Sequence, residues 1–69
     1  MTPAELIDRH KNILLETGAH IYRLEREKDV YTLFTKCPAG YVLNGQISRG
    51  EAMTLIRQAN TIYTPEVVR

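Results

Sequence analysis

The sequence contains a single cysteine, Cys37, and no tryptophan among its 69 residues. One cysteine excludes an intramolecular disulfide, and together with two histidines it makes a poor set of zinc ligands. We therefore expect no structural metal and no cofactor, and a free thiol that suits a reducing, cytoplasmic compartment. A domain of this size reaches a stability of only about 3–5 kcal/mol without such support. A homodimer would add buried apolar surface.

An excess of charge and a long hydrophobic run are also missing. Nine Lys and Arg residues balance eight Asp and Glu residues, so no general attraction to nucleic acid or to an anionic membrane is expected. The apolar runs are short, and no membrane span is predicted. The first residues show no basic segment followed by an apolar run, so we expect no secretory signal.

Catalytic motifs are absent from the sequence as well. There is no nucleophile elbow and no glycine-rich phosphate loop. Cys37 precedes a proline, and its neighbour Lys36 should point to the opposite face of a strand, so no group is placed to activate the thiol. His10 and His20 match no metal-binding spacing, and His10 is expected to be half-buried and hydrogen-bonded, with a pH switch as the alternative. We expect no enzymatic activity.

Two capping boxes are the clearest structural signals in the chain. Thr2 precedes Glu5 by three residues, with Pro3 between them, and Ser48 precedes Glu51 in the same way. A stripe of mostly apolar residues follows each box at helical spacing: Leu6, Ile7, Ile13 and Leu14, with His10 among them, after the first, and Ala52, Leu55, Ile56, Ala59 and Tyr63 after the second. The pattern predicts one helix that ends at Gly18 and another that ends at Thr64-Pro65.

The segment between these helices has the composition of strands. Residues 20–26 and 30–37 are rich in aromatic and β-branched side chains, and the polar residues 27–29 separate them. A turn at 37–40, a short strand at 41–43 and a turn at Asn44-Gly45 complete the segment. The expected fold is α+β with the order helix–β–β–β–helix, a three-stranded antiparallel meander with both helices packed on one face. Residues 1–69 form one domain, with 64–69 as a frayed tail.

The register of the first hairpin can be predicted from its turn. If Lys28 and Asp29 form a two-residue turn, the facing pairs are Leu24 with Leu33, Tyr22 with Thr35, and Arg26 with Tyr31. These residues, with Tyr41 and Leu43, should share the face that meets the helices. The opposite face should carry an uncovered apolar set, and Leu15 should be exposed on the first helix. Together they form the candidate protein interface: Leu15, Ile21, Val30, Phe34 and Val42.

The function that needs fewest assumptions is a small non-enzymatic protein-binding module, a modulator or inhibitor of a partner protein, with a homodimer as one form. The alternative is a nucleic-acid-binding accessory protein that uses exposed aromatics and scattered cations: Arg23, Arg26, Lys28, Lys36 and Arg49. The expected element order resembles the double-stranded RNA-binding domain, which holds phosphates with a lysine cluster at the start of its second helix. Residues 48–52 place one cation and one acid there, so the motif that would carry this activity is absent.

Overall fold

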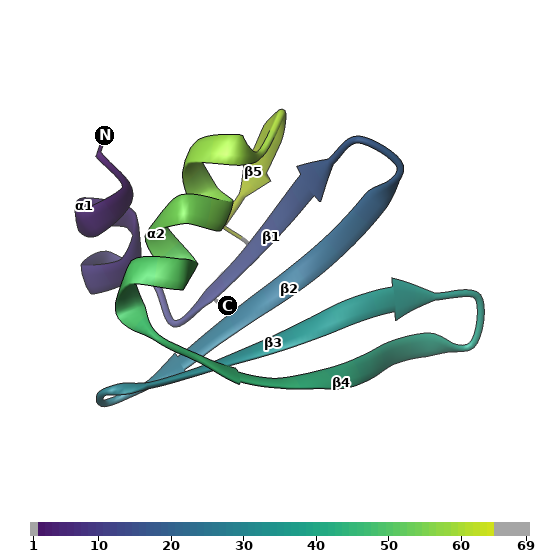
Figure 1. Ribbon diagram of the computed structural model, residues 1–69, viewed down its shortest axis with the longest axis horizontal. Coiled ribbons are helices and arrows are strands. Elements are labelled where there is room, and N and C mark those ends of the chain that lie inside the picture. The colour runs from purple at the N-terminus through teal and green to yellow at the C-terminus, as the bar shows by residue number, and fades with distance from the viewer. Residues whose placement is uncertain (1, 65–69) are drawn as a thin grey trace.

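A five-stranded antiparallel sheet with two short helices forms the fold, as described for residues 2–64 by a computed structural model (Figure 1). The elements are α1 (Pro3–Arg9), β1 (Asn12–Thr17), β2 (His20–Glu27), β3 (Val30–Cys37), β4 (Gly40–Ile47), α2 (Arg49–Gln58) and β5 (Thr61–Tyr63). The strand order is β4-β3-β2-β1-β5. The protein is thus mostly β, and the predicted three-stranded meander flanked by two helices is wrong. Residues 65–69 of the predicted tail lie outside the described residues.

The first predicted helix is wrong beyond its second turn. The capping box at Thr2 and Glu5 forms, but α1 ends at Arg9, and His10 is its C-cap residue. The next residues form β1, which alternates inward Ile13 and Leu15 with outward Leu14. A run of three apolar residues satisfies both a helical and a strand period, so the spacing alone could not separate them. Gly18 has a φ of 59°, which suits a hairpin turn as well as a helix end.

The second predicted helix starts correctly and ends too late. Ser48 and Glu51 form the predicted capping box, whereas the helix stops at Gln58. The backbone N–H of Asn60 donates to the carbonyl of Glu16 at 2.7 Å, and residues 61–63 then pair with β1 as β5. Tyr63, which was predicted to lie on the apolar stripe of the helix, is therefore on a strand and 52% exposed.

The register predicted for the β2–β3 hairpin is confirmed. Leu24 pairs with Leu33, Tyr22 with Thr35, and Arg26 with Tyr31. Lys28, in the two-residue turn, has a φ of 56°, a left-handed conformation that this tight turn requires.

The faces predicted for the third strand are wrong. The turn after β3 pairs Cys37 with Gly40, so Val42 lies opposite Thr35, on the face that carries the helices. Tyr41 and Leu43 consequently point to the other face. Asn44-Gly45 is not a turn: the register shifts there, as at a β-bulge, and β4 continues to Ile47.

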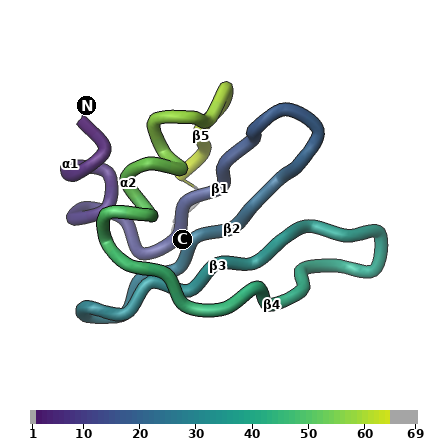
Figure 2. The backbone as a smooth tube through the Cα atoms, viewed as in Figure 1, coloured from purple at the N-terminus to yellow at the C-terminus, as the bar shows by residue number. Residues whose placement is uncertain are grey.

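The core lies between the helices and one face of the sheet. Among residues 2–64 it consists of eight buried residues: Ile7, Ile13, Leu15, Leu24, Tyr31, Leu33, Ala52 and Ile56. Both helices cover the same end of the sheet, while the β1–β2 and β3–β4 turns extend away from them (Figures 1 and 2). The opposite face, called the outer face below, is covered by no helix within residues 2–64.

Candidate interaction surface

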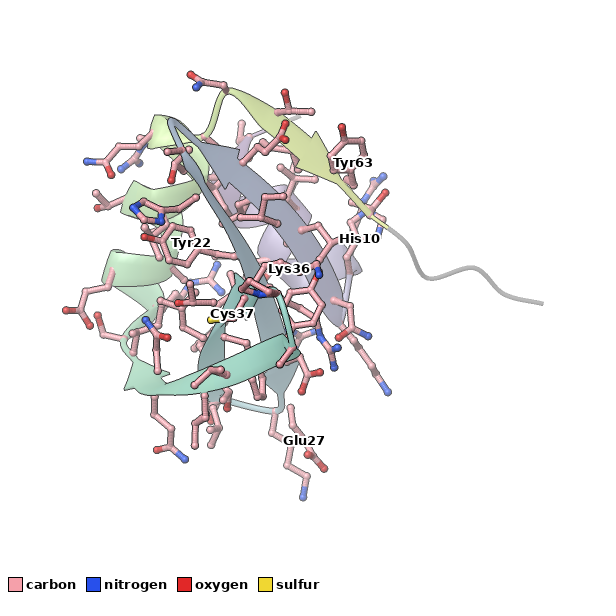
Figure 3. The ribbon with its side chains drawn as sticks, turned by 90° about the vertical axis from the view of Figure 1, so that its right-hand side faces the viewer. His10, Tyr22, Glu27, Lys36, Cys37 and Tyr63 are labelled. Carbon is pink, nitrogen blue, oxygen red and sulfur yellow. The ribbon has the colours of Figure 1, made fainter. Side chains whose placement is uncertain are left out.

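The outer face carries a row of side chains that crosses all five strands. The row runs through Tyr63, Leu14, Arg23, Phe34 and Leu43, each paired in register with the next. Figure 3 shows Tyr63 on one side of the sheet and Tyr22 on the other, beside α2. The alternation of a strand therefore places an apolar and aromatic row where no helix of the described chain covers it.

Arg23 lies at the centre of this row and is held by its neighbours. Its guanidinium carbon is 5.3 Å from the ring centroids of both Phe34 and Tyr41, and Lys36 lies 5.6 Å from the Tyr41 ring. Arg23 also forms an ion pair with Glu25. Cation–π contacts and a carboxylate thus engage the guanidinium, so its charge is largely compensated on the protein itself.

Charges on the outer face are mixed. Arg23 and Lys36 are balanced by Glu16 and Glu25, which lie on the same face by register. An open hollow near the β2–β3 turn is equally mixed, and it is lined by Lys11, Asn12, Glu25, Arg26, Glu27, Lys28, Val30, Thr32 and Gln46. A surface of both signs gives no extended field that would attract a polyanion.

The five cations proposed as nucleic-acid contacts do not share a surface. Arg23 and Lys36 lie on the outer face, and Lys28 lies in the β2–β3 turn. Arg26 donates to the backbone carbonyls of Asp8 and Lys28, each at 3.3 Å. Arg49 begins α2 and is paired on the helix side. The fold therefore separates the cations that this alternative would need to combine.

An ion pair joins the start of α2 to α1. The Arg49 guanidinium donates to Asp8 Oδ1 at 2.9 Å and to Tyr31 Oη at 3.0 Å. The hydrogen bond from Arg49 holds the pKa of the Asp8 carboxyl below its ordinary value, and the Asp8 partner raises the pKa of Arg49. Both side chains are substantially exposed, so this pair positions the helices more than it stabilises them.

We expect the Asp8→Asn variant to lose less stability on acidification than the wild type. The folded-state pKa of Asp8 is depressed, so its contribution is fully present above the unfolded pKa of about 3.9 and is lost as the pH falls through the folded value. Urea unfolding midpoints at about pH 6 and about pH 3 measure the effect. Glu5, whose pKa is also lowered through its bonds to Thr2, is unchanged in both proteins. Equal acid losses in the two proteins would contradict the assignment.

The free edge at β4 is unusually apolar. Val42 is 53% exposed and Leu43 is 61% exposed, which makes them the two most exposed large hydrophobic side chains in residues 2–64. They are adjacent in sequence and point to opposite faces of the sheet. No residue of Gly40–Ile47 is charged. Natural edge strands are usually shortened or protected by charge or proline, and the other edge, β5, is only three residues long.

The residues of the predicted protein interface have separate positions. Ile21, Val30 and Phe34 lie on the outer face, and Val42 lies on the helix face at the β4 edge. Leu15 is fully buried in the core, at 0% exposure, so its predicted exposure is wrong. Sequence reasoning placed Leu43 in the core and missed it as a surface residue. The absence of charge over residues 40–47 was the available signal.

The histidines and the cysteine do not form a common site. His10 caps α1, His20 begins β2 with its ring 6.1 Å from that of Tyr22, and half-buried Cys37 ends β3. No three His, Cys, Asp or Glu side chains of residues 2–64 are grouped to hold a metal ion. Within the same residues, no helix combines the length and apolar character that a membrane span requires.

Comparison with known proteins gives no further assignment. No protein family, no curated protein and no solved structure matches the chain.

Proposed function

We propose that this chain is a small non-enzymatic cytoplasmic protein-binding module that recognises an extended segment of a partner through its β4 edge. The observation that carries the proposal is the pair Val42 and Leu43, the two most exposed large apolar residues of the described chain, on an uncharged edge strand. An edge strand offers unpaired backbone groups to an added strand.

The positions of the two side chains favour strand addition over docking on a face. Val42 and Leu43 point to opposite sides of the sheet, so a partner lying on either face would cover only one of them. A strand paired beside β4 would place its own side chains next to both. Backbone hydrogen bonds would supply affinity, and the alternating side chains would supply specificity.

The outer face extends this edge on one side. Leu43 pairs with Phe34, which contacts Arg23, so a bound strand would continue an existing apolar row. Aromatic and arginine side chains are common at the centres of protein interfaces. Nucleic-acid binding is the weaker candidate because the charges of the outer face are mixed and the five candidate cations are dispersed.

The test is selection from a displayed library of random short peptides against the protein. The protein is immobilised sparsely, so that its copies cannot pair with one another. We expect enrichment of peptides with two or three consecutive apolar residues and little charge, because Val42 and Leu43 point to opposite faces and each needs an apolar neighbour. The binding of these peptides, measured by calorimetry, should weaken at least about tenfold in Val42→Lys. An added strand would remove water from the lysine ammonium, and this desolvation costs free energy.

A matched control is available at the other end of the sheet. Val30 is 43% exposed, lies on β3 and is not on the edge, so Val30→Lys should bind the selected peptides as the wild type does. Methylation of alternate backbone amides in a peptide should abolish binding, because the pairing uses those groups. The proposal would be contradicted by an absence of enrichment, or by selected peptides whose binding ignores Val42→Lys.

A further inference from the structure

We infer that the β4 edge pairs with the β4 edge of a second copy of this chain, in antiparallel orientation about a two-fold axis at Val42. This inference rests on the proposed function, because it uses the same edge and names its occupant. The two five-stranded sheets would then join into one continuous sheet of ten strands. Within residues 2–64, β4 pairs with β3 on one side, and no strand pairs with its other side.

Self-complementarity of the β4 sequence points to a second copy as the occupant. In antiparallel pairing, directly opposed residues point to the same face. With the axis at Val42, Val42 meets the partner's Val42, and Tyr41 meets the partner's Leu43. Each exposed apolar side chain therefore faces an apolar side chain, on the helix face and on the outer face alike.

The register with its axis at Leu43 is less favourable. An axis at Leu43 would oppose Val42 to the partner's Asn44 and Tyr41 to the partner's Gly45, leaving both apolar side chains without an apolar neighbour. The register shift at Asn44 ends the regular part of the edge, so pairing is confined to its first half. Val42 is the register in which the apolar residues of that half all match.

The absence of charge on β4 allows this pairing, and the two-fold symmetry limits the assembly to two copies. No residue of β4 is charged, so the two strands meet without repulsion at the axis. Lys36 belongs to β3, whose backbone would lie three strand spacings, about 14 Å, from the backbone of the partner's β3. The remaining edge, β5, has three residues, so the assembly stops at two copies instead of growing.

The first experiment measures the mass in solution by sedimentation equilibrium over a wide range of concentrations. The contact is small, so we expect a reversible dimer with a dissociation constant in the micromolar range. Its affinity should change little with salt because the pairing residues are uncharged. Val42→Lys places two lysines at the axis and should raise Kd at least about tenfold, whereas Val30→Lys should dimerise as the wild type does.

The second experiment tests the register by oxidative crosslinking. Val42→Cys and, separately, Leu43→Cys and Val30→Cys are made in a Cys37→Ser background. Opposed residues of an antiparallel pair have Cβ atoms about 4.5–5.5 Å apart, within reach of a disulfide after a small shift. Mild oxidation should crosslink Val42→Cys much faster than the other two variants. Circular dichroism of each variant confirms that the fold is retained.

The outcomes separate this inference from the proposed function. A monomer at all concentrations or a dimer unaffected by Val42→Lys would overturn the self-pairing of the β4 edge, and faster crosslinking of Leu43→Cys would overturn the two-fold axis at Val42. If selected peptides still bound the β4 edge, strand recognition of a foreign partner would stand. If neither peptides nor a second copy used the edge, both proposals would fail.

Discussion

Replacing Leu15 with alanine is expected to reduce the free energy of unfolding by about 2–5 kcal/mol, enough to unfold much of so small a protein. Leu15 is completely buried, at 0% exposure. It lies on β1 between Tyr22 of β2 and Ile62 of β5, with helices above it. Because strands on both sides fix its backbone, the cavity left by the substitution can collapse only partly.

Leu14→Ala is the matched comparison for this prediction. Leu14 precedes Leu15 on the same strand but is half-buried on the outer face, opposite Arg23. Its truncation should cost only about 1 kcal/mol. Urea unfolding monitored by circular dichroism gives both values. If residues 3–17 were a helix with Leu14 in its apolar stripe, the order would be reversed, with Leu14→Ala the more damaging change.

Replacing Ile56 with alanine should cost a similar amount, about 2–5 kcal/mol. Ile56 is 3% exposed and, with Ala52, forms the buried stripe by which α2 packs on the sheet. Alanine has the highest helix propensity, so the substitution does not weaken the helix itself. The loss therefore measures the packing of α2 against the core.

The control for Ile56 is its neighbour Arg57, which is exposed in the last turn of α2. Arg57→Ala should change the stability by less than about 0.5 kcal/mol, as is usual for surface substitutions. Thermal and urea melts of the two variants test the assignment. Equal small losses would mean that α2 contributes little to the core.

Prediction from the sequence succeeded where the signal was local. The capping boxes at Thr2 and Ser48 fixed the first residues of both helices, since each box satisfies backbone donors within four residues. The turn at Lys28 and Asp29 likewise fixed the register of β2 against β3, because a two-residue turn leaves only one pairing.

Prediction failed where the apolar residues of a segment fitted both the helical and the strand periodicity. Residues 13–15 are all apolar, and a helix or a strand could bury part of them. The decision depends on β5: residues 61–63 return from the far end of the sequence to pair with β1, which makes β1 an interior strand. No local pattern contains that long-range pairing.

The amino-acid sequence by itself determined the helix starts, the β2–β3 register and the uncharged character of residues 40–47. Only the tertiary structure decided that residues 12–17 and 61–63 are strands, that Leu15 is buried, and that Val42 and Leu43 stand on a free edge. The physical reason is the distance along the sequence between the groups that interact. Caps and tight turns are stabilised by groups a few residues apart, whereas strand pairing and burial depend on which distant segments meet.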